Sequence, residues 1–501
     1  MEKENRSSSI VQLSSGKFLL ICAALSALIL AAGRSVPFTP GVLAAEVFIT
    51  IFLLFILGSF RYQLDKNALT YGAVMVIAAS FFTSWWPRSS LSASFHAAGF
   101  SAIPEFLRVQ LLAFHRLDEL IHLDTMLFIL GLTFYVAVIA QSRMLESLSF
   151  SVLKKTKGNV LWTVAIITAI VSLASGVLDG VSMIGLLIRT LVIILSLVKA
   201  DDAALIFSVI ISTVVTTVCG MWLAYGEPPN LIMKANLHPY LTNAFFLAYC
   251  LPVAVGAYFI VLWNLRRFLT GMKVDMRTLV PPDASSGSRF PIAMGAISLV
   301  PFIGLLIWHG RDHTVPLFWA AFAAFAAALA GLVSAPTARR AALKEAALEY
   351  REYLFLFPLF LSITLLQKSG FFGQMPGLMQ AGTERIGRSL IAFVQFAGAC
   401  FLSALLDNNV VADFASRALH GLELGALHLF SMAQMAGYAA GGCWTHIGSA
   451  QSVVAYAFIR REIDRNYTPV QWMRLMTPIV LQIFVLMFVV IFGLNFIQKF
   501  L

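Results

Sequence analysis

The residues best suited to chemistry in this chain are carboxylates that interrupt long apolar runs. Asp179 lies in SLASGVLDGVSM, and Asp407 lies in the similar segment FLSALLDNNVVAD. Ser175 precedes the first acid and Ser403 precedes the second by the same spacing. A carboxylate in apolar surroundings is costly unless it is paired, hydrated or protonated. Each acid is therefore a candidate for binding a cation or carrying a proton.

Amides accompany the second acid. Asn408 and Asn409 follow Asp407 directly. Serine oxygens and amide groups suit a desolvated sodium ion and an oxyanion alike, so these residues do not decide the sign of a ligand. The simpler interpretation is that each acid caps a broken helix.

A second pair of motifs follows the acids in the same order. GMWLAYG (220–226) and GCWTHIG (442–448) share glycine, tryptophan and glycine at identical spacing. Glu227, two prolines and Asn230 follow the first motif, and consecutive prolines cannot continue a helix. Thr445 and Ser449 supply the polar groups of the second copy. Two motifs repeated in order predict a site built from a duplicated unit.

Three basic side chains lie near these motifs. His446 is a candidate proton carrier or pH sensor, although a buried histidine is more often only hydrogen-bonded. Arg189 and Arg417 each follow an acid by ten residues. They either pair locally, as Asp413 beside Arg417 indicates, or attract an anion. The sequence favours local pairing, and it assigns no role to Glu46.

The composition is that of a polytopic membrane protein. Hydrophobic residues make up 59% of the 501 residues, charged residues make up 12%, and the mean hydropathy is +0.83. A soluble domain carries roughly 25% charged residues. The apolar runs are about 20 residues long, which is the length that crosses a bilayer as a helix. The sequence therefore predicts a lipid-embedded, all-α protein with two polar segments inside it.

The net charge of +10 does not indicate a nucleic-acid partner. Arg and Lys lie mainly in short loops between apolar runs, and no basic stripe alternates with aromatic residues. The five cysteines have neither metal-site nor disulfide spacing. The chain also lacks a Walker motif and a nucleophile elbow. We expect a non-enzyme without a cofactor, driven by an ion gradient.

Run length and flanking charge predict about 11 spans and two re-entrant hairpins. The predicted simple spans are 18–32, 41–60, 69–86, 123–141, 242–265, 290–308, 316–333, 353–367 and 472–496. The predicted hairpins are 159–199 and 386–419, and the predicted broken helices are 205–233 and 429–458. An alternative topology makes each hairpin two full spans, and charge does not exclude it.

The predicted organisation has four parts. Residues 1–122 hold the first spans and an external connection with an amphipathic piece at 105–120, and residues 123–265 form the first repeat. Residues 266–350 hold a basic linker, two scaffold spans and a basic loop, and residues 351–501 form the second repeat. The positive-inside rule then predicts a cytoplasmic N-terminus, an external C-terminus and repeats of inverted topology in a cell membrane.

Four segments resemble one known group in order along the chain. The segments are SGVLDGVSMIGLLIRTLVI, GEPPNLIM, SALLDNNVVAD and GGCWTHIGSAQSVVA. They resemble the hairpins and broken helices of NhaD-type sodium/proton antiporters and related arsenite permeases, in the ion transporter superfamily with its citrate transporter-like domain. The resemblance covers roughly residues 123–458, the linker excepted. Gly180 is a departure, because this group usually has asparagine there.

The resemblance implies a homodimer of inverted repeats in which a transport domain moves against a scaffold. It also implies an ion site lined by residues at matching positions, which are Asp179, Asp407, Asn408, Glu227 and Asn230.

The first functional hypothesis is exchange of sodium or lithium for protons, with Asp179 and Asp407 binding the transported cation. The rival is an anion carrier for arsenite, a dicarboxylate or sulfate. In that rival Ser175, Ser403 and helix ends hold the anion, and Arg189 or Arg417 attracts it. A membrane scaffold or an intramembrane enzyme is disfavoured, because acids buried in duplicate have no use in a scaffold. The expected partners are a small inorganic ion, the bilayer and a second copy of the chain.

Overall fold

The computed structural model describes residues 13–35, 66–84, 96–101, 114–276, 289–312, 314–354, 356–368 and 371–497, with single positions at 53, 64, 93 and 104. In these ranges the secondary structure is helical apart from one isolated bridge between Asn159 and Lys273, which confirms the all-α prediction. The predicted span 41–60, Glu46 and most of the connection before residue 114 lie outside the described residues.

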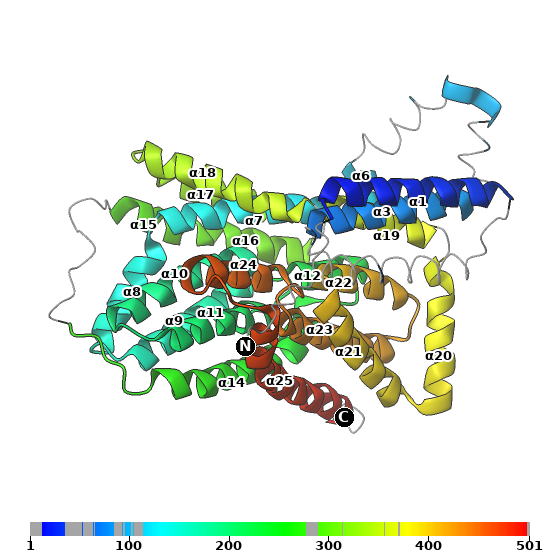
Figure 1. Ribbon diagram of the computed structural model, residues 1–501. Coiled ribbons are helices and arrows are strands. Elements are labelled where there is room, and N and C mark those ends of the chain that lie inside the picture. The colour runs from blue at the N-terminus through cyan, green and yellow to red at the C-terminus, as the bar shows by residue number, and fades with distance from the viewer. Residues whose placement is uncertain are drawn as a thin grey trace, which may run out of the picture. The chain divides into compact units, whose positions relative to one another are not determined.

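The chain divides into two compact units, Met1–Leu123 with Glu352–Leu378 and Asp124–Arg351 with Met379–Leu501. The main helices of the first unit are α1 (Ser15–Ser35), α3 (Lys66–Ser84), α6 (Phe114–Ile121) and α19 (Leu356–Lys368). Helices α1 and α3 lie side by side (Figure 1). Gly72 permits this close approach, because a Cβ there would collide with Phe18 and Cys22 of α1.

The second unit contains all the acid motifs. Its helices before the linker are α7 (Leu123–Gln141), α8 (Met144–Lys155), α9 (Val160–Ser175), α10 (Gly180–Leu197), α11 (Asp202–Thr217), α12 (Pro228–Asn236), α13 (Asn243–Phe245), a π-helical turn Phe246–Cys250 and α14 (Leu251–Leu269). Its helices after the linker are α15 (Arg289–Ile297), α16 (Leu299–Arg311), α17 (Phe318–Ala330), α18 (Pro336–Tyr350), α21 (Arg388–Leu405), α22 (Asn408–Ala418), α23 (Leu424–Trp444), α24 (Ala450–Phe458) and α25 (Pro469–Ile497). Helix α20 (Met375–Ile386) begins in the first unit and ends in the second.

Seven helices of the described residues are long and apolar enough to cross a membrane. They are Ser15–Gly33, Leu123–Gln141, Gly180–Leu197, Asn243–Leu269, Phe290–Arg311, Arg388–Leu405 and Pro469–Asn495. Four shorter apolar helices, Asn67–Thr83, Val160–Ser175, Asp202–Thr217 and Phe318–Ala330, were found in the same ranges. These helices identify a membrane protein, and most of them coincide with predicted spans.

Both segments predicted as hairpins are interrupted at their acids. Helix α9 ends at Ser175 and α10 begins at Gly180, while α21 ends at Leu405 and α22 begins at Asn408. Asp179 is the N-cap residue of α10, and Asp407 is the N-cap residue of α22. The carboxylates occupy the first-turn position where a side-chain oxygen satisfies backbone N–H groups that have no partner within the helix.

The first broken helix differs from the prediction in where it breaks. The sequence predicts an interruption at 225–230, but α11 ends at Thr217 and α12 already begins at Pro228. The two prolines start the second helix instead of ending the first. Proline suits the first helical turn, since its fixed φ is helical and a first-turn N–H has no acceptor within the helix. In the second half, α23 ends at Trp444 and α24 begins at Ala450.

The prediction of a basic loop after the span 316–333 is wrong. Residues 336–350 form α18, with proline in its first turn. Its sequence PTARRAALKEAALEY is dominated by residues with high helix propensity, and their favourable propensities outweigh the charge that made the segment look like a loop.

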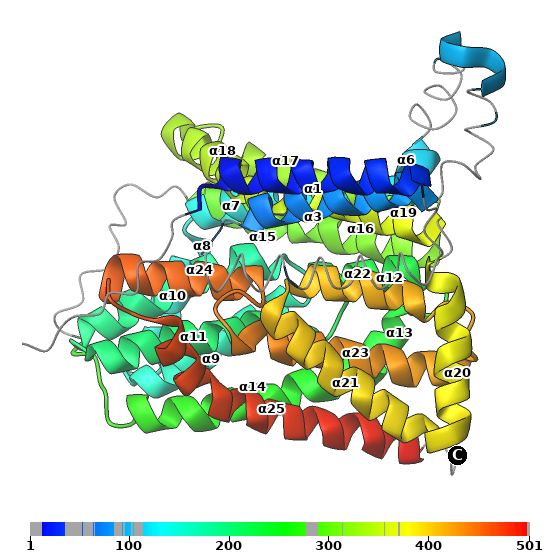
Figure 2. The same ribbon diagram turned by 45° about the vertical axis from the view of Figure 1, so that its right-hand side comes forward.

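The two halves exchange their short helices. Helix α12, from the first half, packs against α22 of the second half, and α24 packs against α10 and α11 of the first half. Figures 1 and 2 show α24 beside α10 and α11 from two directions. Because each short helix begins at a break, this exchange brings the breaks of one half to the hairpin of the other.

Candidate functional site

Asp179 is held at the start of α10 by backbone and hydroxyl donors. Its Oδ1 accepts from the Val181 amide at 3.3 Å, and its Oδ2 accepts from the Ser182 amide at 3.0 Å. The Ser182 hydroxyl donates to the same Oδ2 at 2.7 Å. Asp179 is 2% exposed. The helix N-terminus favours negative charge here, which helps to keep a buried carboxylate in place.

Asp407 has the corresponding position at the start of α22. Its Oδ1 accepts from the Asn409 amide at 2.9 Å and from Asn409 Nδ2 at 2.6 Å. Asn408 and Asn409 are both buried. The capping interpretation therefore holds for both acids, and capping fixes each carboxylate at the break between two helices.

Each hairpin is joined to the break of its own half by matching contacts. The Gly180 amide donates to the Gly226 carbonyl at 2.9 Å, and the Asn408 amide donates to the Gly448 carbonyl at 3.1 Å. Neither broken-helix glycine has room for a Cβ, because the Ser175 carbonyl lies against Gly226 and the Ser403 carbonyl lies against Gly448. The glycine and serine positions shared by the two sequence copies thus make the same contacts.

Glu227 lies between the two halves. Its Oε1 accepts from Gln451 Nε2 at 2.8 Å, and Gln451 belongs to α24 of the second half. Glu227 is 2% exposed, and it interacts electrostatically with Asp179 and with Asp407. A Cβ at Gly180 would lie 2.5 Å from Glu227 Oε1 and 3.0 Å from Gln451 Nε2. The absence of a side chain at position 180 is therefore what admits the Glu227 carboxylate beside the hairpin.

Three other predicted site residues carry buried polar atoms without a hydrogen-bond partner among the described residues. They are Ser175 Oγ, Asn409 Oδ1 and Asn230 Nδ2. Asn230 does accept a hydrogen bond at Oδ1 from the Tyr438 hydroxyl of α23. Buried polar atoms normally have a partner, so each of these three atoms is available to a polar ligand.

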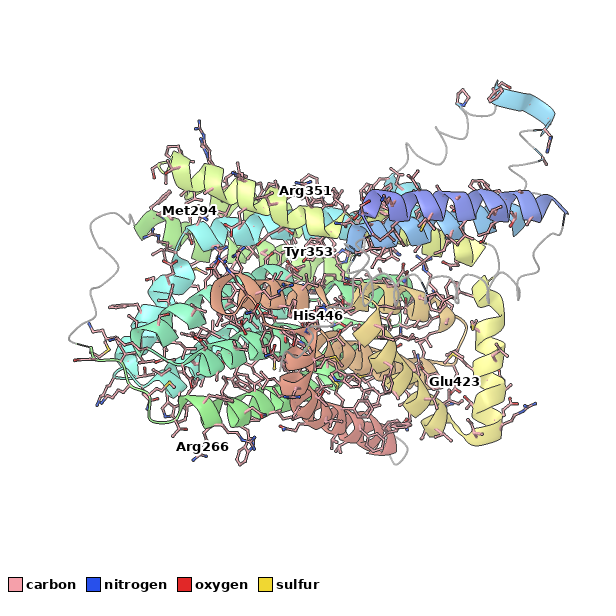
Figure 3. The ribbon with its side chains drawn as sticks, viewed as in Figure 1. Arg266, Met294, Arg351, Tyr353, Glu423 and His446 are labelled. Carbon is pink, nitrogen blue, oxygen red and sulfur yellow. The ribbon has the colours of Figure 1, made fainter. Side chains whose placement is uncertain are left out.

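The serine, threonine and histidine of the second half have mainly local partners. The Ser403 hydroxyl donates to the Tyr438 carbonyl at 2.9 Å, and the Thr445 hydroxyl donates to the Ala404 carbonyl. Ser449 caps α24 by accepting from the Ser452 amide. His446 lies in the loop between α23 and α24 (Figure 3). Its half-buried imidazole ring lies 4.6 Å from the Tyr456 ring, measured between centroids. Among the described residues, the Nδ1 atom of His446 has no hydrogen-bond partner.

The two arginines at matching positions both pair with carboxylates, in different surroundings. Arg189 Nη2 lies 2.7 Å from Glu345 Oε1 of α18, and the Arg189 side chain is 59% exposed. Arg417 Nε lies 2.9 Å from Asp413 Oδ1 one turn earlier, and these side chains are 4% and 0% exposed. Asn236 Nδ2 also donates to Asp413 Oδ1, so this buried pair fastens α12 to α22.

The acids do not form a preformed metal centre. In the part of the chain that the structure describes, no group of three or more His, Cys, Asp and Glu side chains is arranged to hold a metal ion. Glu227 interacts electrostatically with both Asp179 and Asp407, and Ser175 and Asn409 carry buried oxygens without a hydrogen-bond partner among the described residues.

Sequence reasoning missed two residues that reach the first hairpin. Ser182 was noted only as part of the interruption, and Glu349 fell in the segment predicted as a loop. Glu349 Oε2 lies 3.5 Å from Ser182 Oγ. The helix-favouring composition of 336–350 was the signal that could have found Glu349, since it places residues 345 and 349 one turn apart on one face.

Comparisons with known proteins agree with this architecture. No family model matches the chain. Two curated relatives, the uncharacterized transporters Mb2703 of Mycobacterium bovis and Rv2684 of Mycobacterium tuberculosis, are each 21% identical to it over 364 residues, which cover 70% of this chain and 81% of the relative. The solved YdaH transporter of Alcanivorax borkumensis superposes with a TM-score of 0.50 and 15% identity, over 76% of this chain and 89% of that chain.

The fold is that of a solved transporter. At 15% identity the likeness concerns the arrangement of helices and not the roles of single residues. The site must therefore be interpreted from the side chains of this chain itself.

Proposed function

We propose that this protein is a secondary active transporter that exchanges sodium or lithium for protons. Relatives that are named transporters, helices of membrane-crossing length and a transporter fold support the general class. The finer proposal rests on the acids at the two hairpins and on the resemblance of the four motifs to sodium/proton antiporters.

The observation that carries the proposal is the position of Glu227. Its carboxylate is fixed by Gln451 from the other half and interacts with both Asp179 and Asp407. Three buried acids near one another repel when all are ionised, so this arrangement binds either protons or a cation. Ser175 Oγ and Asn409 Oδ1 offer further oxygens for a desolvated cation.

Competition for the same carboxylates gives exchange without additional machinery. A cation bound by Asp407 and Asp179 neutralises the site, and so does a proton on one of them. If only the neutralised site can change its exposure from one side of the membrane to the other, each cation moved in one direction requires protons moved in the other.

The arginines favour a cation over an anion as the transported ion. Arg417 is buried with Asp413 and Arg189 pairs with Glu345, so their positive charges are already balanced by carboxylates. An anion at the hairpins would instead meet Asp179, Glu227 and Asp407. Transport of arsenite, a dicarboxylate or sulfate is therefore the alternative to be tested alongside.

The proposal is tested by proton flux in proteoliposomes that contain the purified protein and an internal pH dye. We expect added sodium or lithium to drive proton movement, and we expect Asp407→Asn to abolish it while the protein stays folded. Glu423→Gln is a matched control, because the Glu423 side chain is 75% exposed and pairs only at the surface with Arg388.

Two outcomes would count against sodium/proton exchange. One is a sodium-dependent proton flux that Asp407→Asn leaves intact. The other is silence towards sodium, lithium and potassium together with a response to arsenite or a dicarboxylate, which would establish the anion alternative.

A further inference from the structure

Helix α18 carries its acids on its buried face. Ala342 and Ala346 are 0% exposed, and the spacing of an α-helix places Glu345 and Glu349 on the same side. Arg340 and Lys344 are exposed on the opposite side. A helix with an apolar core face would normally turn its carboxylates outward, so the inward direction of these two indicates a polar neighbour.

The neighbour is the start of α10. Glu345 pairs with Arg189 of α10 and accepts a hydrogen bond from Gln141 Nε2 of α7 at 3.0 Å. These contacts anchor α18 one turn before Glu349. Glu349 Oε2 then lies 3.5 Å from the Ser182 hydroxyl, which itself lies 2.7 Å from Asp179 Oδ2.

A single hydroxyl thus lies between two carboxylates. It has one hydrogen, which it donates to Asp179, so its contact with Glu349 is favourable when Glu349 is protonated and donates to Ser182 Oγ. When both acids are ionised the serine oxygen faces a second negative oxygen. The geometry therefore favours one shared proton on the pair.

The acids that face Glu349 also favour its protonated form. Helix α18 is not among the candidate membrane spans, and burial, followed by Asp179 and Glu345, raises the pKa of Glu349 to about 7. Arg189 and the Ser182 hydroxyl partly oppose that rise. Glu349 therefore changes its charge near neutral pH.

Resting on the proposed exchange function, we propose that Glu349 is a proton-binding residue of the transport cycle, which passes its proton to Asp179 through the hydroxyl of Ser182. The carboxyl O–H of Glu349 gives its hydrogen to Ser182 Oγ, and the hydroxyl hydrogen of Ser182 moves to Asp179 Oδ2. Glu349 becomes a carboxylate, Asp179 becomes a neutral acid, and the serine is unchanged. The total charge of the three groups stays the same.

In the structure, one of the two contacts on this proton-transfer path is too long for transfer. A hydroxyl hydrogen bond that transfers a proton is roughly 2.7 Å long, so the 3.5 Å contact of Glu349 must shorten by about 0.8 Å. Arrival of a cation at Asp179 would then drive the proton back to Glu349 and towards the exposed side of α18.

The first test observes the proton on Glu349 directly. Infrared difference spectra of the purified protein without any transported ion are recorded between acidic and alkaline pH. We expect a carbonyl band of a protonated carboxylic acid that disappears with a midpoint near neutral pH and is absent in Glu349→Gln. Glu423→Gln, which removes an exposed carboxylate that pairs with Arg388, is the matched control and keeps the band.

The second test uses proton flux in proteoliposomes across a range of pH. We expect Glu349→Gln and Ser182→Ala to lower the flux at least about tenfold near neutral pH, since both interrupt proton transfer. Glu349→Asp keeps an acid and restores part of the flux with a displaced pH profile. A purely structural role would change the amount of folded protein and leave the pH profile where it was.

The two tests separate this inference from the function on which it rests. If the wild-type protein exchanges sodium for protons but Glu349→Gln keeps both the infrared band and the pH profile, the inference is wrong and the function stands. If no cation drives proton flux, sodium/proton exchange is wrong, and the infrared band still decides whether Glu349 binds the proton.

Discussion

At the scale of single residues, the site depends on complementary side-chain sizes. Asp179 and Asp407 were predictable from the sequence, because acids in apolar runs are rare and these two occur in duplicate. The partnership of Glu227 with Gln451 was not predictable, since 224 positions separate them and only the fold brings them together. Gly180 was noted only as a departure from the asparagine of the resembled group, and in the structure the Glu227 carboxylate lies where its side chain would be.

The close contact between positions 180 and 227 predicts that one substitution lowers transport and that a second one partly restores it. Gly180→Ala places a methyl group 2.5 Å from Glu227 Oε1, so we expect transport to fall several-fold as the carboxylate is displaced. Shortening the acid withdraws the carboxylate, and Gly180→Ala combined with Glu227→Asp should recover part of the lost flux. Flux in proteoliposomes measures both, and a double variant no better than the single one would contradict this account.

At the scale of elements, the interruptions at the two acids were predicted, whereas the break before Pro228 was misplaced and α18 was missed. The interruptions at Asp179 and Asp407 were predictable because an acid that caps a helix marks its first turn. Pro228 was interpreted as the end of one helix, although proline fits equally at the start of another. Helix α18 was missed because its net basic charge was weighed above its helix propensity, and Glu349 was missed with it.

Residues at matching positions of the two halves can contribute differently to stability, and the two arginines are an example. Arg417→Ala leaves Asp413 buried without its ion-pair partner, which costs about 3–5 kcal/mol of stability. Arg189→Ala removes a largely exposed pair, which is worth about 0–1 kcal/mol.

Thermal unfolding in detergent measures this contrast. We expect a clearly lower melting temperature for Arg417→Ala and a nearly unchanged one for Arg189→Ala. Equal melting temperatures would show that the buried pair is not structural, and would reopen a role for Arg417 towards an anion.

At the scale of the whole molecule, the sequence predicted a helical membrane protein and two related halves, and it could not predict how the halves exchange α12 and α24. Hydropathy reports which segments enter a bilayer, but it contains no information on which helices touch. The exchange explains why polar residues far apart in the chain gather at the breaks. It also means that neither half can complete its polar site alone.

The predicted orientation is tested with reporters fused to the two chain ends. The distribution of Arg and Lys leads us to expect a cytoplasmic N-terminus and an external C-terminus. A fluorescent reporter that folds only in the cytoplasm should be bright at the N-terminus and dark at the C-terminus, and an exported phosphatase should give the opposite result. Both ends on one side would show an even number of crossings and require a different treatment of the hairpins.

The space at Gly180 has a consequence for how this chain diverges from its relatives. A larger residue at position 180 would crowd a glutamate at position 227, so a change at 180 alone forces the Glu227 carboxylate to shift. We therefore expect the two positions to change together across species, with bulk at 180 accompanied by a shorter residue at 227. We expect Gln451 to be replaced where Glu227 is replaced, because its amide would no longer have the carboxylate to which it donates.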